Sequence, residues 1–161
     1  MGGLAGFVFS IPALIYIVRA SYESSWLLFL GSFLFLIVIW IHTFRDSSKR
    51  QHNESTISLA FASHVTTLVG VVVASLLAFI LLTILVPGYL SPGMAEKTLA
   101  DVPVNNIHDK TNGLSFEIFM AATVINFSVG SFTGIVLPFA VKRNQKKDAR
   151  DPAPLHQQGS R

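Results

Sequence analysis

Four long apolar blocks decide what this chain can fold into. They cover about residues 2–18, 26–42, 59–86 and 114–141, and a helix needs about 17 to 25 apolar residues to cross a bilayer. Lipid offers the backbone no hydrogen-bond partners, so segments of this kind fold as helices. The sequence therefore predicts an all-α integral membrane protein, in which residues 1–141 form a single domain of four transmembrane helices.

The composition agrees with this class of protein. Of 161 residues, 51% are hydrophobic and 13% charged, whereas about 25% are charged in an average soluble domain. The chain has no cysteine, which excludes thiol catalysis and cysteine-ligated metals within it. Its five histidines lack metal-binding spacing, and no nucleotide-binding or nucleophile motif occurs. We therefore expect no enzymatic activity, no cofactor and no metal site.

The first block is the shortest of the four and has a second interpretation as a cleaved signal peptide. A signal peptide needs a basic region before its apolar run, but the first basic residue here, Arg19, follows the run. An uncleaved span is the favoured interpretation. The second block is framed by Trp26 and Trp40, which is typical of the two interfaces of a bilayer.

Lysine and arginine are distributed unevenly between the two sides of the predicted bundle. One side carries Arg45, Lys49, Arg50, Lys142, Arg143, Lys146, Lys147, Arg150 and Arg161, and the other carries Arg19, Lys97 and Lys110. Because cytoplasmic segments are enriched in these residues, both termini are predicted to be cytoplasmic. An even number of spans requires the same arrangement.

The basic side also predicts lipid contacts. Arg45, Lys142, Arg143, Lys146 and Lys147 lie next to the ends of apolar blocks, where cations are attracted to anionic headgroups. Residues 142–161 are predicted to form a basic, disordered cytoplasmic tail, because they have little to bury. Anionic lipid is thus the expected partner of this side, and no nucleic-acid partner is expected.

Small residues in blocks three and four predict how these two spans pack. Block four repeats small or amide side chains every four residues at Ala122, Asn126, Gly130 and Gly134, and block three has a matching face that includes Ser63, Thr67, Gly70, Ala74 and Ala78. Such faces let helix backbones approach closely in lipid. We therefore predict that spans three and four pack through them.

Three polar residues in these blocks need a place in the bilayer. Asn126 lies about 15 Å into block four, near the midplane, where it is either an interhelical hydrogen-bonding group, the favoured interpretation, or a substrate or ion contact. His64 is predicted at the level of the cytoplasmic headgroups. Glu117 is predicted near the outer interface, where it reaches water and its negative charge stabilises the positive N-terminal end of the helix.

The polar stretch "HTFRDSSKRQHNESTIS", residues 42–58, separates blocks two and three. It is predicted to be a cytoplasmic hairpin. Arg45 would end span two and reach lipid phosphate, while Ser55, Thr56 or Ser58 would cap the next helix.

The layout resembles a family of small bacterial inner-membrane proteins known as a domain of unknown function. The resemblance rests on Phe44-Arg45-Asp46 at the end of span two, a polar turn, and Ile57-Ser58 followed by Leu59 and Ala62, with Gly31 early in span two. It implies a four-span protein of the bacterial inner membrane. Phe44 stands where tyrosine is more usual, and the turn is more basic than the glycine-containing turns of the family.

Two functions are consistent with these patterns. The first is a non-enzymatic accessory or structural membrane subunit, which associates with anionic lipid and with another copy or a membrane-protein partner. The alternative is a small transporter or channel component, which the hydroxyl-rich faces of spans three and four favour.

Overall fold

The computed structural model describes residues 1–49, 55–90 and 113–148. Its main elements are α1 (Gly2–Arg19), a 3₁₀ turn (Tyr22–Ser24), α2 (Trp26–Lys49), α3 (Thr56–Leu85), α4 (Leu114–Met120), a π-helical turn η4 (Ala121–Ile125) and α5 (Asn126–Asp148). Within the described ranges all regular structure is helical. Four helical stretches are long and apolar enough to cross a membrane, which confirms the predicted all-α fold with four candidate spans.

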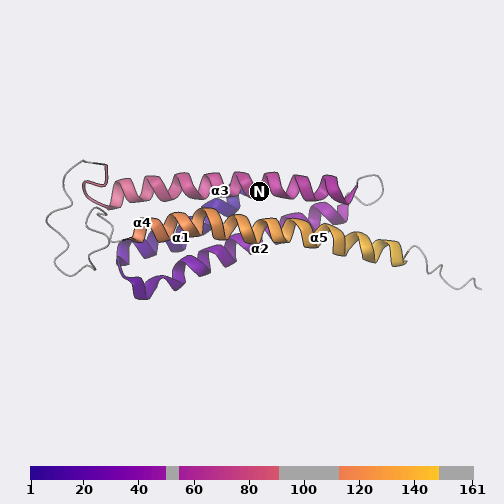
Figure 1. The fold of residues 1–161 in the computed structure, drawn as a ribbon, viewed down its shortest axis with the longest axis horizontal. Helices are drawn as coiled ribbons and strands as arrows, with labels where there is room; N and C mark the ends of the chain where they lie inside the picture. Colours follow the sequence, from indigo (N-terminus) through magenta and orange to yellow (C-terminus); the bar gives the residue numbers. More distant parts are fainter. Residues whose placement is uncertain (50–54, 91–112, 149–161) are drawn as a thin grey trace, which may run out of the picture.

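The helices form a four-membered bundle (Figure 1). The α1 helix packs against α2 and α3, and α5 packs against the same two helices, so α1 and α5 lie at opposite corners. The α4, η4 and α5 segments follow one another as a single long rod beside α3 (Figure 1). The α2 and α3 helices occupy the other two corners, and each of them contacts both α1 and α5.

The interior combines a few large side chains with many small ones. Phe9, Tyr16, Phe35, Ile39 and Ile118 are fully buried. The outward faces, by contrast, carry large apolar side chains that are mostly exposed: Val18, Phe61, Ile84 and Phe132 are each exposed by 66% or more. A soluble monomer rarely exposes so much contiguous apolar surface.

The α2 helix extends beyond the predicted end of its span. Residues 43–49 continue the helix, because Thr43 and Ser47 turn inward and are buried. Thr43 Oγ1 shares a 2.8 Å hydrogen bond with Ser63 Oγ of α3. Most of the predicted hairpin 42–58 is therefore helical, and of this hairpin only residues 50–54 lie outside the described residues.

The beginning of α3 agrees with the expected capping. Ser55 is the N-cap residue, and its Oγ accepts a 3.1 Å hydrogen bond from the backbone N–H of Ser58. This bond satisfies one of the free N–H groups of the first turn. Of the three capping candidates, Ser55 is the one that the structure selects.

The predicted tail begins too early. The α5 helix continues to Asp148, so disorder from residue 142 onward is wrong for residues 142–148. Basic residues at 142, 143, 146 and 147 stabilise a helix C-terminus through its negative dipole end. The remaining tail, residues 149–161, lies outside the described residues.

The α1 helix is shorter than its neighbours, and its first turn lies partway along α3. A Cβ atom built on Gly2 would contact the carbonyl oxygen of Thr66 and lie 3.0 Å from the backbone nitrogen of Gly70. Thr66 is ten residues after Thr56, where α3 begins, which corresponds to about 15 Å of helix. At this end of the bundle, α2 and α3 therefore continue past the start of α1, and we call this change in the number of helices the step.

Candidate functional site

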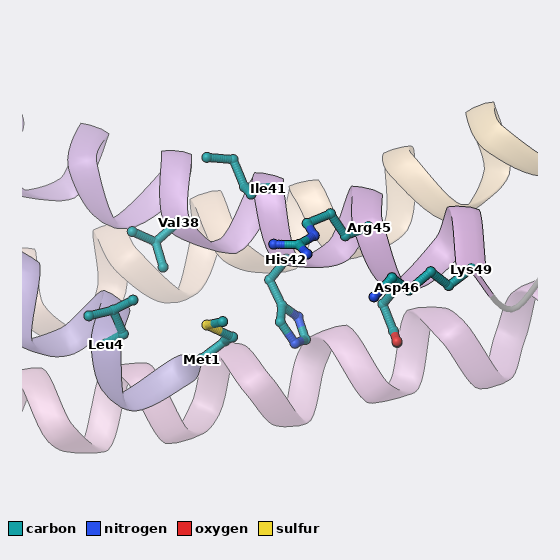
Figure 2. Close-up of a pocket in the computed structure, with 8 residues that line it drawn as sticks. All are labelled: Met1, Leu4, Val38, Ile41, His42, Arg45, Asp46 and Lys49. Atoms are coloured by element: carbon teal, nitrogen blue, oxygen red, sulfur yellow. The ribbon is translucent and has the colours of Figure 1, made fainter.

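The step at the start of α1 holds a pocket of about 370 Å³ (Figure 2). Its apolar wall consists of Met1, Leu4, Val38 and Ile41, and its polar wall consists of His42, Arg45, Asp46 and Lys49. A volume of roughly 300 to 1,000 Å³ is typical of ligand pockets. The pocket lies between the start of α1 and the end of α2. Its lining includes Arg45 and Asp46, two residues of the Phe44-Arg45-Asp46 triplet.

Helical geometry explains why one wall is polar. His42, Arg45, Asp46 and Lys49 have the spacing i, i+3, i+4, i+7, which places them along one face of α2. Val38 precedes His42 by one turn on the same face, so this face changes from apolar to polar along the helix axis. The pocket therefore lies at a boundary between apolar and charged surroundings.

The His42 ring occupies the centre of the polar wall. Figure 2 shows the ring pointing from α2 into the space between Met1 and Asp46. Its Nδ1 atom is buried and has no hydrogen-bond partner among the residues that the structure describes. Buried polar nitrogens are almost always paired, but water-sized groups do not reach this atom in the structure, so it is not itself a contact for a ligand in the pocket.

The charged side chains give the pocket a positive excess. Arg45 and Lys49 are exposed cations, while Asp46, the single carboxylate of the lining, is half-buried. Two cations against one anion favour a ligand that carries negative charge. The predicted lipid contact of Arg45 thus falls in a defined pocket.

Lys142 and Arg143, two further predicted headgroup cations, are not among the residues that line this pocket. Arg143 is exposed and Lys142 is half-buried, both near the end of α5. Lys146 and Lys147 belong to the last turn of α5, but the description does not extend to their side chains. Their contact with headgroups remains a prediction.

Two of the predicted packing glycines lie between α5 and α3. A Cβ atom on Gly130 would lie 2.7 Å from Thr67 Oγ1, and one on Gly134 would lie 2.9 Å from Ser63 Oγ. The two helices approach so closely here that a methyl group would overlap with side chains of α3. This contact joins spans three and four in the way that the sequence predicts.

Gly70 and Ala74 have a neighbour that the sequence did not predict. A Cβ atom on Gly6 of α1 would lie 2.5 Å from the carbonyl oxygen of Gly70 and 2.8 Å from the backbone nitrogen of Ala74. This part of the α3 face therefore packs against span one, a contact that the sequence did not predict, and α3 also contacts the η4 segment of span four. The overlooked pattern is Gly2-x-x-x-Gly6, which is also a small-residue motif. Ala78, one turn further on, is buried.

Asn126 lies in the interior but makes no interhelical hydrogen bond. It is fully buried, and neither its Oδ1 nor its Nδ2 atom has a partner within the described ranges. Thr67 Oγ1 is equally buried and unpaired there. Asn126 directly follows the π-helical turn η4, and such turns are frequent at functional sites. The favoured role as a hydrogen-bonding group between helices is not seen in this structure.

Glu117 and His64 both have partners. Oε2 of Glu117 accepts a 2.5 Å hydrogen bond from the hydroxyl of Tyr16, which is fully buried in α1. His64 Nδ1 donates to the carbonyl oxygen of Ala60 at 2.7 Å, since a carbonyl can only accept. The Tyr16 contact was not predicted. One available signal was the spacing of Phe9 and Tyr16, which are seven residues apart and therefore share one face of a helix.

Comparisons with known proteins assign no relative. No family model, curated protein or solved structure matches the chain. The family resemblance of the Phe44-Arg45-Asp46 region therefore stays a prediction. Among the described residues, no group of three histidine or carboxylate side chains could hold a metal ion.

Proposed function

We propose that this chain is a multi-pass protein of the bacterial inner membrane, with both termini in the cytoplasm. We propose further that it acts as a non-enzymatic accessory or structural subunit. The observation that carries the membrane location is the apolar outer surface of four long helices. The backbone-level contacts of Gly6 and Gly130 support a scaffold role, because they fix the helices against one another.

The length of α3 supports a specific position of the bundle relative to the hydrocarbon core of the membrane. Residues Thr66 to Leu85 of α3 measure about 30 Å at 1.5 Å per residue, which is the thickness of a hydrocarbon core. The α2 and α3 helices run in opposite directions (Figure 1), and the Thr43–Ser63 hydrogen bond joins them at one level, so Trp40 lies about level with Thr66. Tryptophan is enriched at membrane interfaces, so we infer that the pocket lies at the level of the cytoplasmic headgroups.

The orientation is testable because the chain has no cysteine. We would introduce single cysteines by Ser91→Cys, in the α3–α4 connection, and by Ser160→Cys, near the C-terminus. A membrane-impermeant maleimide should label the first variant on intact cells and the second only after permeabilisation. Labelling in the opposite order would overturn the proposed orientation.

The accessory role requires a partner. In vivo crosslinking followed by purification of the full chain from native membranes should yield a stoichiometric complex, either with another membrane protein or with a second copy of the chain. Recovery of a monomer alone under these conditions would contradict the accessory role.

A small transporter or channel component is the second candidate function. The observation that favours it is the pair of unpaired polar groups on Asn126 and Thr67 in the bundle interior, since polar groups at such depth often line a pathway. Reconstituted protein should then pass ions or small solutes in a liposome assay, and Asn126→Leu should reduce the flux. Absence of flux from correctly oriented protein would exclude this candidate.

A further inference from the structure

We propose that the pocket between α1 and α2 is a binding site for one anionic phospholipid, with the phosphate on the polar wall and the first part of an acyl chain on the apolar wall. The inference rests on the proposed membrane location, which puts the pocket at headgroup level. It goes beyond diffuse attraction between basic residues and lipid, because it assigns a single, shaped site.

The polar wall fits a phosphate group. Arg45 can donate two N–H bonds to phosphate oxygens and Lys49 adds a second cation. The ring of His42 adds a polar side chain to the same wall. The lining carries two cations and one carboxylate, so a phosphodiester with a single charge matches it better than a multiply charged anion.

The apolar wall distinguishes a lipid from a soluble phosphate. Leu4 and Ile41 line the pocket and are each 51% exposed, so the pocket opens onto the outer apolar surface of the bundle. A free phosphate or sugar phosphate would leave this wall in contact with water. An acyl chain covers it and continues along α1 and α2 into the hydrocarbon region.

The headgroup should be anionic as a whole. A zwitterionic lipid would bring its ammonium group close to Arg45 and Lys49, which repel it. Phosphatidylglycerol has no cation in its headgroup and is therefore the probe of choice, with phosphatidylcholine of the same acyl chains as the matched comparison.

Native mass spectrometry of the full chain, purified in detergent with a C-terminal tag, tests the site. Dioleoylphosphatidylglycerol should bind at one molecule per chain, at least about tenfold more tightly than dioleoylphosphatidylcholine. The double variant Arg45→Gln/Lys49→Gln should lose this difference. The control Arg19→Gln/Lys97→Gln removes the same charge from two residues that are not among the predicted headgroup contacts or the pocket lining, and it should keep the difference. Equal loss in both variants would show diffuse electrostatic attraction and overturn the proposal.

A second pair of variants tests the apolar wall. Leu4→Trp fills the pocket without changing its charge and should abolish retention of phosphatidylglycerol. Phe7→Trp, on an exposed part of α1 outside the lining, should not. If inorganic phosphate or glycerol 3-phosphate displaces the lipid at similar concentrations, the site recognises a free anion and the lipid assignment fails. These measurements use detergent, so they remain informative even if the labelling experiment overturns the membrane orientation.

Discussion

The hydroxyl of Tyr16 in α1 donates a 2.5 Å hydrogen bond to Oε2 of Glu117 in α4. The two residues are 101 positions apart in the sequence, and their bond joins α1 to α4 at the end of the bundle opposite to the pocket. The tyrosine is fully buried and the carboxylate half-buried. A carboxylate acceptor makes this a charge-assisted bond of the stronger kind.

Tyr16→Phe should lower the free energy of unfolding by about 1 to 3 kcal/mol, because it leaves the half-buried carboxylate without its donor. Denaturation in detergent, followed by circular dichroism, measures the change. Tyr89→Phe is the control for loss of a hydroxyl from a half-buried tyrosine and should have a smaller effect. A Tyr16→Phe/Glu117→Leu double-mutant cycle with no coupling energy would contradict the predicted contribution of this bond.

Gly130→Ala should destabilise the protein by about 1 to 3 kcal/mol, since the added methyl group overlaps with the side chain of Thr67. Thr67→Ala removes the overlapping atoms and should restore most of the loss in the double variant. The midpoint of thermal unfolding in detergent is the measurement. If the double variant is as unstable as Gly130→Ala, the two residues do not meet at this interface.

Gly6→Ala should be at least as damaging as Gly130→Ala, and no single side-chain truncation in α3 should rescue it. The reason is that its methyl group would overlap with backbone atoms of Gly70 and Ala74. Gly3→Ala is the matched control in the same helix, because a Cβ atom there has no neighbour within 4 Å. Equal stability of these two variants would show that α1 does not pack on α3 through Gly6.

Asn126→Leu should leave stability unchanged or raise it. The amide is fully buried and unpaired among the described residues. The substitution replaces this unsatisfied polar group with an apolar side chain of the same number of non-hydrogen atoms. The free energy of unfolding in detergent is compared with that of Thr133→Val, whose hydroxyl donates to the carbonyl oxygen of Val129. A loss above about 1 kcal/mol for Asn126→Leu would indicate a stabilising contact of the amide.

Hydropathy predicted the helices well and their ends poorly. The limits of the apolar blocks mark where apolar side chains stop, whereas a helix stops where its backbone hydrogen bonds stop. Thr43 and Ser47 are polar, yet α2 includes both, because they pack inward and Thr43 bonds to Ser63. The sequence predicted that span four ends at residue 141, but α5 ends at Asp148. The reason is related, since basic side chains stabilise a helix C-terminus.

The sequence by itself determined the fold class and the small-residue motifs, because span length, apolar composition and glycine spacing are local properties of the chain. Only the tertiary structure decided which helix each motif meets: Gly130 contacts Thr67, while Gly70 contacts Gly2 of α1. It alone revealed the Tyr16–Glu117 bond and the pocket, because both depend on the level at which α1 begins beside α3. Small faces are similar in all these helices, so the pairing is set by how the large side chains of the whole bundle fit together.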